Sequence, residues 1–524
     1  MGLFTRSRAP RILGGIALVG AGALVLAGCS GSSSPESSGS ADAGFEFPID
    51  CNAAEPAAYT PTYNSTSTGP GTDLTYKIGT ALPVTGNLAF LGPPEIAGTE
   101  YAASEVNAAA KGVTVDLIQG DSGDTDNKAY ETEIPRLLGE GATAIIGAAS
   151  SGTSLQFIDQ VIAANAIQFS PANTSAAFTG YKDNGLYWRT APSDVLQGEV
   201  LGNQIAADGN ETLGMIVLND SYGTGLACFT KKSFEAAGGS VVAASLYNTG
   251  DTNFSAQVED VLAAKPDAIA LITFEEVKTI IPELKGADFP ADKMYFVDGN
   301  LSNFGDEFDP GTLTGAKGTY PAVDPAKIST FRDALQAFNT AQGNAELTDF
   351  TYAPESYDAV ILLALAALEA GSTAGPDVAA HLQQVSGGSG DGKKCTSYAE
   401  ADIIISGAVA DYDGVSGPIT FNDVGDPTEA TIGIFQYGDD NNQVPQHRLS
   451  RRGGAPRGPA AVRGGAARTD ASHAPHHGCF ARPHHGCSCA PARAHESAPH
   501  HGCGLIRARR ARAGNSRQAP SVPR

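Results

Sequence analysis

Residues 141–155 read Gly-Ala-Thr-Ala-Ile-Ile-Gly-Ala-Ala-Ser-Ser-Gly-Thr-Ser-Leu, and this stretch has the clearest structural pattern in the chain. The apolar run 144–147 is too short for a helix and predicts a buried strand, whereas apolar residues recur at helical spacing over 155–162. We therefore expect a strand, a turn at Ser150 and Ser151, and a helix. The first amide hydrogens of that helix would have no partner within it, so the turn would favour a negative group such as a carboxylate.

A second short strand, 167–170, leads into a similar polar turn, with Ser-Pro-Ala-Asn-Thr at 170–174. In open α/β sheets, ligands bind in the crevice outside the carboxyl ends of the strands, where such turns meet. The two turns are therefore candidates for a site that binds an anionic small molecule. The alternative is that their Ser and Thr side chains are plain helix N-caps.

Strands and helices alternate along most of the chain, which predicts βαβ units with parallel sheets. Before residue 192 we expect strands 74–80 and 113–119 and helices 95–110 and 128–138, beside the stretch quoted first. From residue 195 we expect helices 195–207, 226–237, 254–264 and 277–284 and strands 213–218, 241–246, 268–272 and 294–297. Two such sets predict two lobes. Later helices, 328–341 and 356–369, and strands near 419–421 and 432–437 would complete them.

The N-terminus has the pattern of an export signal. Three Arg precede the apolar run 12–25, which is short for a membrane span, and Leu-Ala-Gly-Cys closes the segment at 26–29. This closing run resembles the lipobox of bacterial lipoproteins, which implies that Cys29 is lipidated and becomes the mature N-terminus. The Ser- and Gly-rich stretch 30–42 would then be a flexible tether.

The chain has 524 residues and a formal net charge of −23, but its C-terminal tail is basic. Residues 447–524 contain fourteen Arg against one Asp and one Glu, together with nine of the ten His and four of the eight Cys. The acidic body argues against a nucleic-acid partner, because phosphate binding needs a clustered basic face. We expect the tail to be disordered, consistent with translation of a shifted reading frame. Metal binding through its His and Cys is the alternative.

Seven motifs between residues 74 and 438 together resemble the leucine/isoleucine/valine-binding class of solute-binding proteins that serve ABC transporters. In chain order they are Leu-Pro-Val-Thr-Gly (82–86), Ala-Ser-Glu-Val-Asn-Ala-Ala (103–109), Ser-Ser (150–151), Ser-Pro-Ala-Asn-Thr (170–174), Trp-Arg-Thr (188–190), Asp-Ser-Tyr-Gly-Thr-Gly (220–225) and Tyr-Asp-Gly-Val-Ser-Gly-Pro-Ile-Thr-Phe-Asn (412–422). The resemblance implies an α/β fold of two doubly wound parallel-sheet lobes, joined by three hinge crossings. A solute would be held in the cleft between the lobes and captured by their closure.

The resemblance also implies the ligand-binding residues. The carboxylate of an amino-acid solute would be held by Ser150, Ser151, Ala172 and Thr174. The second lobe would contribute Tyr222 and Phe274 as an aromatic wall and Asp298 as the partner of the ammonium group, with Glu275 as second choice. An anion is needed there because a buried ammonium without a partner is costly. The chain departs from the family at Leu91, where many members carry an aromatic residue, so the resemblance leaves the identity of the solute open.

Cys51, Cys228 and Cys395 remain in the exported body, and two of the three are expected to pair in an oxidising location. A bond between Cys228 and Cys395 would connect the second lobe to its late strands, but the sequence alone does not set the connectivity. One thiol would be left over in any case.

Taken together, these features predict a lipid-anchored, monomeric solute-binding protein on the outer face of the cell membrane. It would deliver an amino acid or similar solute to the permease subunits of an ABC importer, with no catalysis, cofactor or metal. The alternatives are a lipoprotein that scavenges metal through its tail and a secreted α/β enzyme, although no Gly-x-Ser-x-Gly elbow is present. The expected parts are a signal peptide (1–28), a lipidated Cys with its linker (29–73), lobe 1 (74–191 and 320–386), lobe 2 (192–319 and 387–446) and the tail (447–524).

Overall fold

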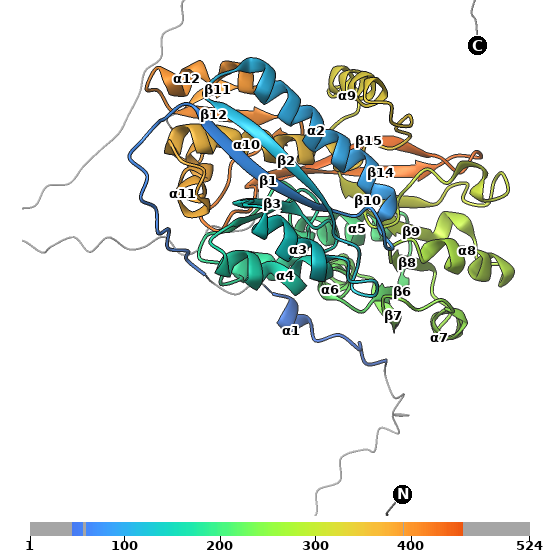
Figure 1. Cartoon of the computed structure of the whole chain (residues 1–524). Coiled ribbons are helices and arrows are strands. Elements are labelled where there is room, and N and C mark those ends of the chain that lie inside the picture. Colours follow the sequence, from blue (N-terminus) through green and yellow to red (C-terminus); the bar gives the residue numbers. More distant parts are fainter. Residues whose placement is uncertain (1–44, 56–58, 391, 454–524) are drawn as a thin grey trace, which may run out of the picture. The chain divides into compact units, whose positions relative to one another are not determined.

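Two β-sheets organise the structure, a computed structural model that describes residues 45–55, 59–390 and 392–453 (Figure 1). The first sheet has the strand order β2-β1-β3-β4-β5, with all neighbours parallel. Its strands are β1 Leu74–Leu82, β2 Val113–Asp121, β3 Ala144–Gly147, β4 Ile167–Ser170 and β5 Tyr187–Arg189. The helices that belong to this lobe are α2 Gly92–Ala109, α3 Tyr130–Gly139, α4 Ser151–Ala163, α9 Ser329–Ala341, α10 Ala353–Ala370 and α11 Gly375–Val385.

The second sheet has the order β15-β14-β10-β9-β8-β6-β7. Its strands are β6 Thr212–Leu218, β7 Ser240–Tyr247, β8 Ala268–Ile272, β9 Met294–Val297, β10 Lys317–Pro321, β14 Glu429–Tyr437 and β15 Gln443–Gly453. Strands β6 to β10 pair in parallel, whereas β14 is antiparallel to both of its neighbours. The helices of this lobe are α5 Asp194–Ala207, α6 Ser221–Ala236, α7 Ser255–Ala263 and α8 Val277–Gly286.

The stretch 141–163 forms the predicted strand, turn and helix. Strand β3 is buried along its whole length. Ser150 is the N-cap of α4, since its side-chain oxygen accepts a hydrogen bond from the Thr153 amide at 3.2 Å. Ser151 is the first residue of the helix, so both serines lie at the carboxyl end of β3, as the sequence predicts.

The chain passes between the two sheets three times, near residues 190–193, 322–328 and 422–428. The late part of the chain differs from the expected division, because residues 393–421 pack with the first lobe. Tyr412 and Phe421 are buried in that lobe's core, and the Phe421 ring lies 5.1 Å from the ring of Trp188. The segment forms a small sheet and one short helix: β11 Lys393–Cys395, β12 Ala410–Gly414, β13 Gly417–Pro418 and α12 Asp402–Ile405.

Several other elements were not expected from the sequence, among them strands β5 and β10. Helix α11 follows α10 directly, and strand β15 pairs antiparallel with β14 as far as residue 453, which includes the first residues of the expected tail. No single described helix is long and apolar enough to span a bilayer. Helices α10 and α11 pass that test only as a pair bent by 107°, and α10 is almost entirely buried core. The signal segment, Cys29 and residues 454–524 lie outside the described residues.

The cysteine pairing differs from the one we considered. Cys51 is bonded to Cys228, and Cys395 is the leftover thiol, buried in the first lobe. The pair Cys228 and Cys395 cannot form because β11 and the short strands beside it pack on the first core, away from α6. Cys51 instead belongs to a four-residue helix, α1 Cys51–Ala54, which packs against α6.

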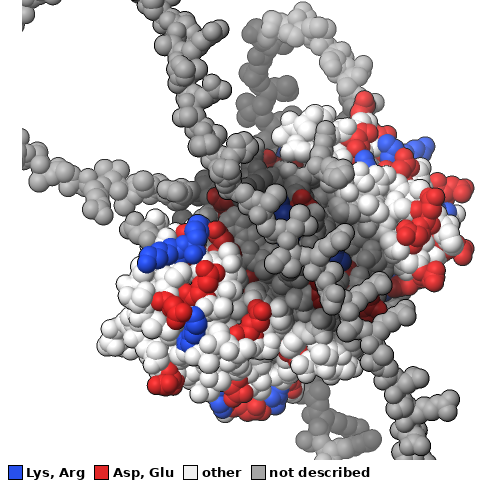
Figure 2. All heavy atoms as spheres, turned by 90° about the horizontal axis from the view of Figure 1, so that it is seen from above, with Lys and Arg blue, Asp and Glu red and all other residues white. Residues whose placement is uncertain are grey.

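On the face drawn in Figure 2, acidic and basic side chains are interspersed. Acidic side chains lie in both areas of described residues, on either side of the grey atoms. The described atoms visible there form no broad basic patch of the kind that phosphate contacts need. Within the described residues no cluster of three or more His, Cys, Asp or Glu side chains is arranged to hold a metal ion. The metal-binding alternative concerns the tail, of which only residues 447–453 belong to the described part of the chain.

Candidate functional site

The first polar turn lies at the amino end of α4 and is closed to solvent. Ser150 and Ser151 are both buried, and the Ser151 hydroxyl oxygen accepts a hydrogen bond from the Ser175 amide at 3.3 Å. This contact joins the start of α4 to the end of the second turn. The sequence-predicted pair of turns therefore forms one continuous polar surface on the first lobe.

The second turn, residues 170–175, is held from below by its own side chains and by Arg189. The Ser170 hydroxyl oxygen accepts hydrogen bonds from the Ala172 amide at 3.2 Å and the Asn173 amide at 2.9 Å. The buried Arg189 guanidinium donates to the carbonyl oxygens of Asn173 and Ser175 at 3.1 and 2.8 Å. These bonds fix the position of Thr174 in the same turn.

On the second lobe, Asp298 follows strand β9 and is the centre of a hydrogen-bonded cluster. Its Oδ1 accepts from the Tyr222 hydroxyl at 2.6 Å and from Gln197 Nε2 at 2.9 Å, and its Oδ2 accepts from the Tyr352 hydroxyl at 2.8 Å. Phe274 stacks on Tyr222 with ring centroids 5.2 Å apart. Burial raises the pKa of Asp298, while these three side-chain donors lower it.

The two groups of predicted residues meet across the lobes. The Ser175 hydroxyl donates to the Ser221 carbonyl at 2.9 Å, and Ser221 is followed by Tyr222, which holds Asp298. A Cβ atom on Gly152 would lie only 2.5 Å from Asp220 Oδ2, so the starts of α4 and α6 are in close contact. The lobes are therefore closed on one another at this position.

Glu275, the second choice for the ammonium partner, does not belong to the buried cluster. Its side chain is about one-third exposed and forms an ion pair with Lys278 at 3.1 Å. The remaining predicted residues, by contrast, are all at least nine-tenths buried: Ser150, Ser151, Ala172, Thr174, Tyr222, Phe274 and Asp298.

Sequence reasoning missed Asp194, the first residue of α5, which is fully buried beside this cluster. Neither of its carboxylate oxygens has a well-formed hydrogen bond among the described residues, although the neighbouring Thr174 side chain lowers its pKa. Burial raises the pKa of Asp194 well above its ordinary value, and the charge of Asp298 raises it further. Asp is common in the first turn of a helix, so nothing in the sequence indicated a binding role for Asp194.

Several other buried polar atoms near Asp194 also lack well-formed hydrogen bonds within the described chain. They are Thr174 Oγ1, Gln197 Oε1, Ser221 Oγ and Thr319 Oγ1. Buried polar groups in native proteins are nearly always hydrogen-bonded, so a cluster of orphaned ones marks a place that a polar molecule fills. The cluster contains both hydroxyl groups and carboxylates, with Asp194 directly beside Thr174, which suits a zwitterion whose charged groups are close together.

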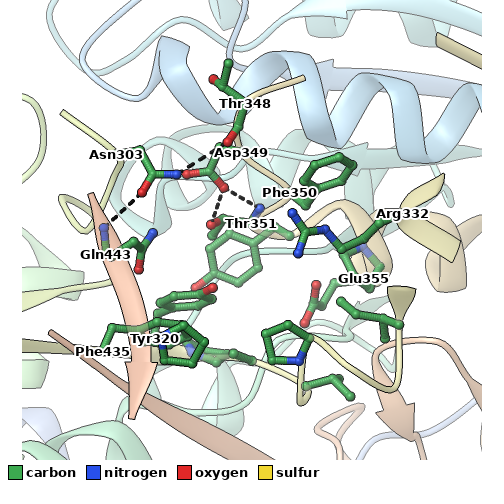
Figure 3. Close-up of a pocket in the computed structure, with 18 residues that line it drawn as sticks. Asn303, Tyr320, Arg332, Thr348, Asp349, Phe350, Thr351, Glu355, Phe435 and Gln443 are labelled. Carbon is green, nitrogen blue, oxygen red and sulfur yellow. Dashed lines mark hydrogen bonds between the residues drawn. The ribbon is translucent and has the colours of Figure 1, made fainter. Parts of the chain in front are cut away.

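Tyr352, also missed, links this cluster to an open pocket of about 200 Å³ (Figure 3). The pocket lies beside the chain crossing at 322–328, which contributes Ala322, Val323, Pro325 and Ile328 to its lining. Figure 3 shows the Arg332 guanidinium and the Glu355 carboxyl pointing into the same space. Its walls include Tyr320, stacked on Phe435 at 4.3 Å, and Phe350, over which Arg332 lies at 4.3 Å.

Glu355 makes the stability of the fold depend on pH. It is 6% exposed, and burial raises its pKa from 4.5 to about 8, with a further rise from the charge of Asp358. A raised acid pKa means that the folded state binds the proton more tightly than the unfolded chain does. The stabilising contribution is therefore full below pH 4.5 and is lost as the pH rises through about 8.

We accordingly expect Glu355→Gln to melt at a higher temperature than the natural protein at pH 8.5 and close to it at pH 4. Thermal melting at the two pH values measures this difference. Glu346→Gln, at an exposed acid of the nearby loop, is the matched control and should leave the pH dependence unchanged. If the melting temperature of the Glu355→Gln variant changed between the two pH values as much as that of the natural protein, Glu355 would not be the source of the pH dependence.

The comparisons with known proteins agree with this geometry. A family model described as periplasmic binding protein matches residues 75–401. A substrate-binding protein of a chemotactic signal transduction system, BasB of Halobacterium salinarum, is 26% identical over 292 residues, covering 53% of this chain and 66% of that protein. The Leu/Ile/Val-binding protein homolog 1 of Brucella abortus is 29% identical over 315 residues, covering 59% and 82%.

Solved structures show the same two-lobed fold. A leucine-binding protein from Thermotoga maritima superposes with a TM-score of 0.57 at 19% identity, covering 71% of this chain and 98% of that one. A branched-chain amino acid binding protein from Streptococcus pneumoniae, in complex with isoleucine, gives 0.56 at 21% identity, covering 71% and 100%. Because the family model spans more than half of the sequence, this chain belongs to the periplasmic binding protein family, with the type I fold.

Proposed function

We propose that this protein is the extracytoplasmic solute receptor of an ABC importer, and that it captures an amino acid of the branched-chain type, or a similar small solute, by closure of its lobes. The observation that carries the proposal is the cluster of orphaned buried polar atoms at the junction of the lobes. Those atoms belong to both lobes, so a solute that satisfies them would hold the lobes together.

The proposed binding mode divides the solute between the two lobes. The turn residues Ser151 and Thr174 offer hydroxyl donors to the α-carboxylate at the start of α4, and Ala172, whose amide is held by Ser170, lines the same turn. Asp194 and Asp298 face the ammonium group, and the stacked pair of Tyr222 and Phe274 covers the apolar part. The buried Arg189 is already paired with Asp426 at 2.6 Å. It therefore does not compete with the ammonium group of the solute for Asp194 and Asp298.

The names of the relatives support this solute class. The Brucella protein is named for leucine, isoleucine and valine, and a Pseudomonas aeruginosa relative, 30% identical over 189 residues, is named as binding leucine, isoleucine, valine, threonine and alanine. A Rhodopseudomonas palustris structure of the same fold contains benzoate, so the panel of solutes to be tested must include aromatic acids.

The location and partners belong to the same proposal. Cys29 carries the lipid, the linker lets the body stand away from the membrane, and the closed receptor docks as a monomer on the permease subunits. No cofactor takes part, and the work of the protein is capture rather than catalysis.

A thermal-shift screen of the full chain, purified in detergent, tests the proposal. The panel contains the twenty amino acids, short amides, urea and aromatic acids. A true solute at 100 times its dissociation constant stabilises the folded state by about 2.7 kcal/mol, which raises the melting temperature by several degrees. If no member of the panel shifts the melting temperature, the proposed solute class is wrong.

A further inference from the structure

We propose that the open pocket beside Tyr352 is a second ligand site, separate from the amino-acid site, and that it binds the carboxylate of a small aromatic acid through Arg332. We call this cavity of about 200 Å³ the Arg332 pocket. Residues of both lobes line it, among them Tyr320, Arg332, Phe350, Tyr352, Glu355 and Gln443. The inference rests on the chemistry of this lining and does not depend on the proposed capture of an amino acid.

The Arg332 guanidinium is a cation without an acidic partner. It lies 4.3 Å from the centre of the Phe350 ring, and within the described residues its side chain has no ion pair and no hydrogen bond. Figure 3 shows it pointing into the cavity. A guanidinium that lies over an aromatic ring keeps its N–H edge available, and that edge can donate two parallel hydrogen bonds to a carboxylate. The pocket therefore favours an anionic, planar group at this position.

The acidic groups that line the pocket leave the charge of Arg332 available. Glu355 points into the same space, but burial raises its pKa to about 8, so near pH 7 it is mostly protonated and can itself donate a hydrogen bond to a carboxylate. Asp349 directs its Oδ1 to Thr351, whose amide and hydroxyl donate to it at 2.7 and 2.6 Å. A carboxylate bound by Arg332 would thus also meet a neutral acid that acts as a donor.

Two oxygen atoms among the lining residues are acceptors without a donor. Asp349 Oδ2 and Gln443 Oε1 are buried, and neither has a hydrogen-bond partner within the described chain. Figure 3 shows Gln443 across the cavity from Arg332 and Glu355. Buried polar atoms are nearly always hydrogen-bonded in native proteins, so a ligand with a hydroxyl group away from its carboxylate would satisfy what the protein leaves open.

The remaining walls of the Arg332 pocket are aromatic and apolar. Tyr320 stacks on Phe435 with ring centroids 4.3 Å apart, and Phe350 and Tyr352 contribute two further rings. Aromatic walls with a few convergent polar groups are typical of small-molecule sites. An apolar cavity of about 150 Å³ already accommodates benzene, so a cavity of about 200 Å³ has room for one substituted ring. The lining therefore suits a single-ring hydroxy acid.

The Arg332 pocket is distinct from the amino-acid site. None of the residues proposed to contact the amino acid, Asp194 and Asp298 included, lines it. The Tyr352 ring belongs to the pocket lining, whereas the Tyr352 hydroxyl donates to Asp298 at 2.8 Å. Tyr352 is only 2% exposed, so its ring fills the space between the two sites. We therefore expect the aromatic acid and the amino acid to bind at the same time.

Isothermal titration calorimetry of the full chain in detergent tests the inference. The probe is 4-hydroxyphenylacetate, and 4-hydroxyphenylacetamide is its uncharged counterpart of the same size. The acid should bind roughly 10- to 100-fold more tightly than the amide, because only the acid forms charge-assisted hydrogen bonds with Arg332. This comparison uses the natural protein, so it does not depend on the folding of any variant.

Arg332→Gln should weaken binding of the acid by the same factor and leave binding of the amide nearly unchanged. Arg136→Gln is the matched control, because this guanidinium is also partly exposed and belongs to the first lobe but is paired with Glu133 and Glu140. It should bind the acid as tightly as the natural protein does. Equal losses of acid and amide binding in Arg332→Gln would mean that the guanidinium only shapes the pocket, which would overturn its proposed role.

A second pair of measurements separates this pocket from the amino-acid site. Asp194→Asn should bind the acid as tightly as the natural protein, and saturating isoleucine should not displace the acid. If the acid fails to bind, depends on Asp194 instead of Arg332, or is displaced by isoleucine, the inference of a separate site is wrong. Titration of the acid into the Arg332 and Asp194 variants needs no amino acid, so it tests the pocket even if the proposed function fails.

Discussion

Asp194→Asn is expected to weaken amino-acid binding by roughly 10²- to 10³-fold, because it removes the one buried carboxylate of the site that has no well-formed hydrogen bond in the described chain. Loss of one member of a buried charge pair costs about 3–5 kcal/mol, since the other member is left uncompensated. Here the ammonium group of the solute would keep only Asp298, whose two oxygens already accept three hydrogen bonds. Isothermal titration calorimetry with the solute identified by the thermal-shift screen measures the change.

The same substitution should raise the melting temperature of the solute-free protein. Burial raises the pKa of Asp194, which means that the folded state disfavours its charged form, and Asn has the same shape without the charge. Weaker binding by a more stable protein excludes misfolding as the explanation. It would also show that this buried carboxylate lowers the stability of the fold and is retained because it binds the solute.

Glu275→Gln is the matched control, because this acid also lies near the junction of the lobes but is partly exposed and paired with Lys278. We expect its affinity to stay within about twofold of the natural protein, as for a solvent-screened charge. If Asp194→Asn binds as tightly as the natural protein, the ammonium group belongs to Asp298 alone.

Arg189→Leu is expected to lower the free energy of unfolding by about 3–5 kcal/mol, as for the loss of one partner of a buried ion pair. Arg189 is 0% exposed, and its Nε donates to Asp426 Oδ1 at 2.6 Å. Its removal leaves the Asp426 carboxylate with only the Thr179 hydroxyl as a donor, and it removes the side-chain donor to the carbonyl oxygens of Asn173 and Ser175. Urea unfolding at pH 7 measures the loss.

The loss should extend to solute binding, because Arg189 holds the turn that contains Thr174. Arg136→Leu is the control: that guanidinium is partly exposed, pairs with Glu133 and Glu140, and should change stability by about 1 kcal/mol or less. Adding Asp426→Leu to Arg189→Leu should recover part of the stability, since no buried charge then remains. Strictly additive effects of the two substitutions would refute the coupling.

The parts of the fold that could be predicted are those coded by local patterns. The run 144–147 and the helical spacing after it gave the strand and helix correctly, and Ser150 is the N-cap that its position implied. The family resemblance supplied the two lobes. Neither depended on knowing which distant residues meet.

The parts that could not be predicted depend on contacts between residues far apart in sequence. Tyr352 reaches Asp298 across 54 positions, and an isolated Tyr before a helix gives no periodic signal. The bond from Cys51 spans 177 positions, so nothing local distinguished it from the alternative with Cys395. The assignment of residues 393–421 to the first lobe depended on Tyr412 and Phe421 finding its core, which spacing alone does not show.

The position of Cys51 has a consequence for how the receptor would sit on the cell surface. If Cys29 carries the proposed lipid, the chain from the membrane first reaches the protein at the outer side of α6, after at most about 55 Å of backbone up to residue 45. The second lobe is then the one attached to the membrane anchor. During closure, the first lobe would move further than the second relative to the bilayer. A permease that recognises the solute-bound receptor would thus contact a second lobe that is nearly stationary and a first lobe that moves on closure.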